Sequence, residues 1–138
     1  MEDKAQYGVD RYEAEPSGPD TLARKFQKEL SAGLVALVLL SVLERAEEDL
    51  YGYQIAKRLH RDGATGSLVK QGALYPVLRT LSAAGLLASR VVPSYSGPPR
   101  RYYRITSEGR AALERWRAIW RDTRDFVDEF TETTGGNP

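Results

Sequence analysis

One segment of the chain, residues 31–45, limits the possible fold more than any other. In the sequence SAGLVALVLLSVLER, Leu34, Leu37 and Val38 repeat at helical spacing, and the opposite helix face is apolar too. A helix of this length that is apolar all round belongs inside a core. With Ser31 as its predicted N-cap, this segment is expected to be the helix around which the rest of the chain packs.

Two further helices are predicted after this segment. Residues 51–62 carry apolar side chains at every fourth position and end at an Asp-Gly pair. Residues 71–84 place leucine and valine on one face, and Gly85 suits the C-terminal cap. Pro76 falls within the first two turns of that helix, where the backbone at Gly72 has room to adjust to the proline ring.

A β-hairpin is predicted next. Residues 87–92 and 101–105 are rich in β-prone side chains and flank a segment with three prolines and a glycine. This pattern predicts a longer loop that carries Arg100 and Arg101 at its tip. Successive strand residues face opposite sides of a sheet, so at least one member of the Tyr-Tyr pair in the second strand is predicted to pack against the core.

A long helix, residues 107–132, completes the pattern and is capped by Thr106 or Ser107. Apolar side chains recur along it at alternating spacings of three and four, as in a coiled-coil seam. The seam consists of Leu113, Trp116, Trp120, Thr123, Val127 and Phe130, and a second stripe consists of Ala112, Ile119 and Phe126. We expect one edge of this wide surface to pack on the domain and the other on a second subunit.

The order helix, helix, helix, hairpin, helix predicts a mainly α (α+β) winged helix-turn-helix with a C-terminal dimerisation helix. The expected organisation is a flexible acidic arm over residues 1–20 and a winged-helix domain over 21–106. The dimerisation helix at 107–132 and a disordered tail at 133–138 follow.

Positive charge is concentrated in one part of the chain. The net charge is only +1, yet residues 57–110 hold ten basic and two acidic side chains, whereas residues 1–20 hold two basic and six acidic ones. A basic block of this size is typical of a surface that binds a polyanion. An ordinary solvated surface is the alternative that composition alone leaves open.

In a winged helix the third helix enters the major groove of DNA, and a basic wing suits phosphates or a narrow minor groove. The candidate DNA contacts are Lys57, Arg58, Lys70, Gln71, Tyr75, Arg79, Arg100, Arg101 and Arg104. Three alternatives stay open: Tyr75 as a core residue, Arg79 as an ordinary exposed residue, and the two basic residues of the second helix as aids to solubility.

Three blocks of the sequence resemble the signature of the PadR family of transcriptional regulators. They are YGYQIAKRL at 51–59, GALYPVLRTLSAAGLL at 72–87 and GPPRRYYRITSEGR at 97–110, and their order and spacing match as well. The resemblance implies a homodimer whose third helices and wings bind a palindromic operator in double-stranded DNA. It also implies repression that a small molecule or a stress signal relieves.

The chain departs from the family pattern in two places: Gln54 stands where the family often has Glu, and the acidic arm lies outside the usual pattern. Some small relatives bind flat aromatic compounds between tryptophans at the dimer interface. The resemblance places Trp120 at that position, which suggests a planar aromatic effector. The alternative is that Trp116 and Trp120 are dimer core.

The sequence gives no indication of an enzyme. Cysteine is absent and His60 is the single histidine, so the usual zinc ligand sets cannot form, and no cofactor or metal is expected. No nucleophile motif or phosphate-binding glycine loop occurs. The longest apolar run, residues 34–40, is too short to span a membrane, which favours a soluble, cytoplasmic protein. A winged-helix module that binds an acidic partner protein is the alternative function, and the basic block favours DNA.

Overall fold

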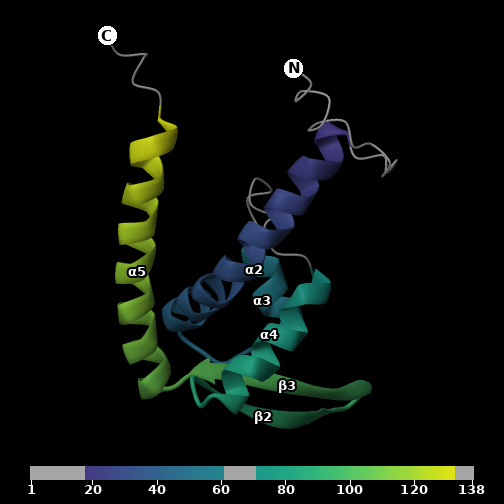
Figure 1. Ribbon diagram of the computed structural model, residues 1–138. Coiled ribbons are helices and arrows are strands. Elements are labelled where there is room, and N and C mark those ends of the chain that lie inside the picture. The colour runs from purple at the N-terminus through teal and green to yellow at the C-terminus, as the bar shows by residue number, and fades with distance from the viewer. Residues whose placement is uncertain (1–17, 61–70, 133–138) are drawn as a thin grey trace, which may run out of the picture. The chain divides into compact units, whose positions relative to one another are not determined.

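The computed structural model describes residues 18–60 and 71–132 (Figure 1). Its elements in order are α2 (Pro19–Arg45), β1 (Leu50–Tyr51), α3 (Gly52–Leu59), α4 (Gln71–Ala83), β2 (Leu87–Ser94), β3 (Gly97–Ile105) and α5 (Ser107–Thr131). The contacts divide the chain into two compact units between Gly33 and Leu34. The two units are therefore described one after the other.

The first unit holds the N-terminal half of α2. This helix begins at Pro19, twelve residues before the predicted start, so the prediction of Ser31 as an N-cap is wrong. The Ser31 hydroxyl instead donates a hydrogen bond to the Gln27 carbonyl oxygen at 2.8 Å, as a residue inside a helix does. The added turns carry good helix formers and an i,i+4 ion pair between Lys25 and Glu29 at 2.7 Å. Leu22, Phe26 and Leu30 recur at every fourth position of these turns and are exposed, so the sequence carries a helical repeat here that the prediction did not use.

In the second unit, residues 34–45 of α2 form the central helix of the core, as predicted. Val35, Leu39, Leu40 and Leu43 are buried there. Within the described part of the chain, α2 is also the one helix long and apolar enough to cross a membrane by length and composition. The burial of Val35, Leu39, Leu40 and Leu43 against the rest of this unit accounts for part of that apolar character.

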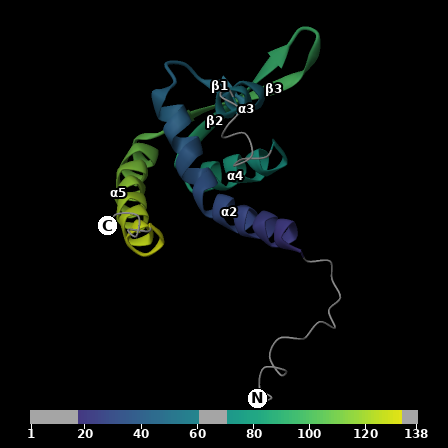
Figure 2. The same ribbon diagram turned by 90° about the horizontal axis from the view of Figure 1, so that it is seen from above.

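The sheet has three antiparallel strands in the order β1-β3-β2, one more than the predicted hairpin (Figure 2). Strand β1 pairs Leu50 with Tyr103 and Tyr51 with Tyr102. Tyr51 was predicted to lie in a helix, but it is a strand residue, and α3 starts at the next residue. Two residues are too few to show a strand period. The prediction extended the helix to residue 62, but α3 ends at Leu59, and residues 61–62 lie outside the described part.

The third predicted helix is confirmed as α4, with Leu74, Leu78 and Leu81 buried. The helix continues through Pro76. Gly85 has a φ of +83°, the left-handed conformation that glycine favours, and the Leu86 amide donates to the Leu81 carbonyl oxygen at 3.0 Å. This is the Schellman ending predicted for that glycine. Contacts place α4 against β2, as Figure 1 shows.

The hairpin is confirmed, but its loop is shorter than predicted. Strands β2 and β3 continue to a two-residue turn at Tyr95 and Ser96, with a register irregularity around Pro93. Strand β3 has no second neighbour beyond the short β1, so its prolines need no ladder hydrogen bond on that edge. Arg100 and Arg101 therefore lie within β3, opposite Val92 and Val91, and not at a loop tip.

The N-cap prediction at Thr106 is confirmed, because its hydroxyl accepts a hydrogen bond from the Gly109 amide at 2.9 Å. The first turns of α5 pack into the same core as α2, with Ala112 and Leu113 buried. Together these elements form a mainly helical winged fold with a small antiparallel sheet. The predicted fold class is confirmed, with β1 as the addition.

Candidate nucleic-acid interface

The exposed side of α4 carries Tyr75 and Arg79, while its leucines face the core. The Tyr75 ring covers the backbone of Gly52, where an added Cβ would lie only 2.6 Å from the phenol oxygen. Yet 43% of the tyrosine remains exposed. Tyr75 therefore packs against the start of α3 with one side of its ring and leaves the other side open to a ligand.

The wing has two faces, and the inner face of the wing, which carries Tyr103 and Arg101, looks toward α4. Tyr103 is buried, as predicted for one member of the tyrosine pair. Burial raises the pKa of its hydroxyl, and the charges of Arg101 and Arg79 act in the opposite direction. Arg101 lies two residues before Tyr103 and so shares its face of β3. Arg101 also donates to the Ser89 hydroxyl at 3.1 Å, which directs the guanidinium along this face.

The outer face of the wing carries Arg100, Tyr102 and Arg104, because alternate residues of β3 share one side of the sheet. Arg100 and Arg104 are exposed, and Tyr102 is partly buried. The Arg100 guanidinium carbon lies 4.5 Å from the centre of the Tyr51 ring. The two wing arginines at 100 and 101 thus serve opposite faces of one strand.

Helix α3 contributes two exposed basic side chains, Lys57 and Arg58. The Lys57 ammonium lies 6.0 Å from the centre of the Tyr53 ring, and Tyr53 is itself 60% exposed. With Tyr51 and Gln54, these residues line an open hollow. The Gln54 side-chain oxygen accepts a hydrogen bond from the Tyr51 amide at 3.1 Å, so this departure from the family's usual Glu keeps an acceptor at the start of α3.

Three tyrosines of this surface were not among the contacts predicted from the sequence: Tyr51, Tyr53 and Tyr102. The available signal was the sequence RRYYR at 100–104, in which arginine and tyrosine alternate along each face of the strand. Nothing in the sequence showed which other side chain each ring contacts. Two of the predicted contacts are not placed: Lys70 lies outside the described residues, and Gln71 begins α4 without a described side chain.

Exposed cations and aromatic rings from α3, α4 and β3 can bind phosphates and base edges. Over residues 18–60 and 71–132, no group of three acidic, histidine or cysteine side chains could hold a metal ion.

Helix α5 differs from the prediction in how its apolar surface is divided. Leu113 is completely buried in the chain's own core, so its assignment to a ligand or dimer interface is wrong. Trp116 packs against the same core. Farther along, Trp120 is half-buried, whereas Val127 and Phe130 are 45% and 72% exposed. The N-terminal turns of α5 are buried by the domain and its C-terminal turns are exposed. The prediction had instead assigned one edge of the helix to the domain and the other edge to a second subunit.

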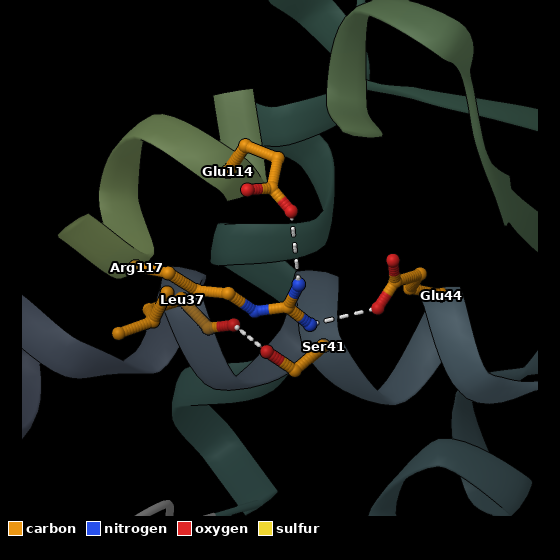
Figure 3. Close-up of polar contacts among 5 residues, drawn as sticks. All are labelled: Leu37, Ser41, Glu44, Glu114 and Arg117. Carbon is orange, nitrogen blue, oxygen red and sulfur yellow. Dashed lines mark hydrogen bonds and ion pairs between the residues drawn. The ribbon is translucent and has the colours of Figure 1, made fainter. Parts of the chain in front are cut away.

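An ion pair fixes the first half of α5 to α2. The Arg117 guanidinium lies 2.7 Å from a carboxylate oxygen of Glu44 on α2 and 3.6 Å from one of Glu114 on its own helix (Figure 3). Beside it, the Ser41 hydroxyl donates to the Leu37 carbonyl oxygen at 2.9 Å. Together with the packing of Leu113 and Trp116 on the core, this contact joins α5 to α2.

Comparisons with known proteins identify the family to which this winged fold belongs. The model of the "Transcriptional regulator PadR-like family" matches residues 39–115, more than half of the chain. A transcriptional regulator of Mycobacterium tuberculosis is 38% identical over 116 residues, which cover 81% of this chain and 96% of that protein. The chain belongs to the PadR-like family.

Solved structures of transcriptional regulators show the same fold. A PadR family transcriptional regulator from Eggerthella lenta superimposes with a TM-score of 0.68 at 34% identity, covering 83% of this chain and 96% of that one. A transcriptional regulator from Clostridium thermocellum gives 0.66 at 28% identity, with coverages of 75% and 99%. This PadR-like chain is therefore a transcriptional regulator that acts through DNA, and not an enzyme.

Proposed function

We propose that this PadR-like protein is a cytoplasmic, dimeric repressor that binds a palindromic operator and releases it when a small molecule binds. The exposed Arg79 on α4, the helix that packs against β2, and the exposed Arg101 on the inner face of the wing support this proposal most directly. A recognition helix and a wing that present cations to the same region suit a groove and its adjacent backbone.

The exposed basic side chains have different roles in this proposal. Arg79 and Tyr75 on α4, with Gln71 and Lys70 before them, face the major groove, where arginine and glutamine can read base edges. The wing residues Arg100, Arg101 and Arg104 bind phosphates or enter the neighbouring minor groove. Lys57 and Arg58 of α3 contact the backbone and add affinity without sequence preference.

A second copy of the chain covers the C-terminal half of α5. Its apolar side chains are exposed within one chain and are unusual for a soluble surface; they are Ile119, Phe126, Val127 and Phe130. The Phe126 and Phe130 rings pack edge to face, with centroids 5.0 Å apart. A two-fold arrangement of such helices would place two α4 helices at the half-sites of a palindrome.

The effector site we propose lies beside Trp120, which the domain core leaves half-buried. A planar aromatic compound can stack on an indole face, and a positive charge on the compound would add attraction to the ring. Quenching of tryptophan fluorescence by planar cationic dyes tests this assignment, with Trp120→Ala as the variant that abolishes it. Quenching that persists in Trp120→Ala would move the site elsewhere.

A gel-shift titration tests the function as a whole. The probe is the DNA upstream of the protein's own gene, with a scrambled fragment as competitor at physiological salt. We expect specific retardation at nanomolar protein, weakened about tenfold or more by Arg79→Ala and Arg101→Ala, with Arg115→Ala on α5 as the control. Equal competition by the scrambled DNA would contradict operator recognition and favour an acidic partner protein.

A further inference from the structure

A row of two neighbouring aromatic rings with an arginine at each end lies on the outer face of the wing. The Arg90 guanidinium carbon is 5.2 Å from the Tyr102 ring centre, Tyr102 meets Tyr51 edge to face at 5.3 Å, and Arg100 covers Tyr51 at 4.5 Å. We call Arg90, Tyr102, Tyr51 and Arg100 the cation–aromatic row. It joins β2, β3 and β1, so it ties the wing to the start of α3.

Strand register explains why these four side chains meet. Tyr51 pairs with Tyr102 across β1 and β3, and Arg90 pairs with Tyr102 across β2 and β3, so these three share one face. Arg100 lies two residues before Tyr102 on the same face, diagonal to Tyr51. The row therefore depends on β1, the strand that the sequence did not reveal.

The two arginines at the ends of the row are not equivalent. The Arg90 Nε donates to a carboxylate oxygen of Asp49 at 3.0 Å, which compensates its charge. Within the described residues no acidic side chain pairs with Arg100, and it is exposed. Stacking on a ring occupies one flat side of a guanidinium and leaves its in-plane N–H groups available. Arg100 is thus held and still able to bind.

We propose that Tyr51 is a positioning residue for DNA recognition: its ring holds the Arg100 guanidinium on the outer face of the wing, ready to contact DNA. This inference rests on the proposed function. A fixed arginine loses less rotamer freedom on binding than a mobile one, so preorganisation strengthens the complex without adding a contact. The ring face carries the effect, because the attraction of a cation comes from the aromatic quadrupole and not from the hydroxyl.

A double-mutant cycle on the full chain tests the coupling. The variants are Tyr51→Leu, which keeps an apolar side chain, Arg100→Ala, and both together, titrated with the upstream DNA fragment. We expect each single change to weaken binding about tenfold and the double variant to bind no more weakly than Arg100→Ala. Tyr51→Phe should bind as the unchanged protein does. Arg115→Ala, an exposed change on α5 outside the row, is the control and should change affinity less than twofold.

Additive effects of the two single changes would overturn the proposal, because a merely structural tyrosine weakens binding whether or not Arg100 is present. A loss in Tyr51→Phe equal to that in Tyr51→Leu would also overturn it, since the hydroxyl would then be the active group.

A second measurement needs no DNA and separates this proposal from the proposed function. In the free protein, protons of the Arg100 side chain should resonate upfield in NMR spectra because they lie over the Tyr51 ring. This shift should disappear in Tyr51→Leu and persist in Tyr51→Phe. If the upfield shift is present but the protein binds no DNA specifically, the proposed function is wrong. If the protein binds DNA but shows no upfield shift, the positioning role of Tyr51 is wrong.

Discussion

Gly109 lies where α5 leaves the sheet, and it has no room for a side chain. A Cβ at this position would meet the Leu86 carbonyl oxygen and would come within 2.7 Å of Ile105 Cγ1. The Gly109 amide also donates to the capping hydroxyl of Thr106. The close approach of two backbones explains the glycine without any appeal to its conformational freedom.

We therefore expect Gly109→Ala to lower the free energy of unfolding by about 2 kcal/mol, the usual cost of forcing atoms into a packed site. Chemical denaturation monitored by circular dichroism measures it. Gly33→Ala, inside α2, is the control, because alanine is a better helix former there. An alanine at position 109 that leaves stability unchanged would show that the α5 junction is looser than described.

The surroundings of Tyr103 make the stability of the protein depend on pH. Burial raises the pKa of its hydroxyl above the ordinary value, although Arg101 and Arg79 oppose the shift. The folded protein thus holds this proton more tightly than the unfolded chain does. The stability that results is complete below about pH 10, the pKa of an unfolded tyrosine, and is lost as the pH rises through the folded pKa.

The free energy of unfolding should therefore fall more steeply above about pH 10 in the unchanged protein than in Tyr103→Phe, which has no proton to lose. Urea titrations at a series of alkaline pH values compare the two slopes. Identical slopes would mean that the hydroxyl is solvated in the folded protein.

Among the secondary structure elements, those with a strong period or a clear cap were predictable. Helix α4 has both, with leucines on one face and Gly85 at its end, and α5 begins at a capping threonine. The first turns of α2 repeat Leu22, Phe26 and Leu30 four residues apart, but the prediction began at the denser apolar run after Ser31. The two residues of β1 show neither a period nor a cap, because very short strands depend on tertiary contacts. The prolines between residues 92 and 101 led to the prediction of a long loop there, although the unpaired edge of a strand tolerates proline.

The candidate site was predictable to the same extent. Charge concentration identified the basic surface, and alternation placed Tyr102 and Tyr103 on opposite faces. The contact of Arg100 with Tyr51 joins residues far apart in the sequence and depends on the register of β1, which no local pattern encodes. For the same reason, the sequence did not show that Leu113 belongs to the domain core.

The junction of α2 and α5 depends on the ion pair of Arg117 with Glu44. Their side chains are 31% and 29% exposed, so solvent screens the pair only in part. We expect a double-mutant cycle with Arg117→Ala and Glu44→Ala to give a coupling of about 1 kcal/mol in thermal or chemical unfolding. Lys25 and Glu29, an exposed pair within one helix, should couple less. Coupling no larger than in that pair would leave the direction of α5 to apolar packing alone.

At the scale of the whole molecule, α5 has two parts with different partners. Its first turns are buried by the domain, and its last turns expose phenylalanines that nothing in the described chain covers. A monomer with such a surface would be prone to association. The proposed dimer uses this surface to link two DNA-binding units, so dimerisation and operator affinity should fail together.

Replacing Phe126 and Phe130 by serine tests this link. Both side chains are largely exposed, at 61% and 72%, so the change should leave the fold of one chain intact. We expect the double variant to be a monomer in sedimentation velocity experiments at micromolar concentration. It should lose about a hundredfold or more in affinity for a full palindrome, because two half-sites then bind independently.

Affinity for a single half-site should stay unchanged in the serine variant, because α4 and the wing are untouched. Arg121→Ser, another exposed change on α5, serves as the control and should remain dimeric. If the serine variant stays a dimer, the α5 surface is not the interface. If the variant is a monomer with unchanged affinity for the full palindrome, each chain binds its half-site alone. The two-fold arrangement of the recognition helices then contributes nothing to affinity.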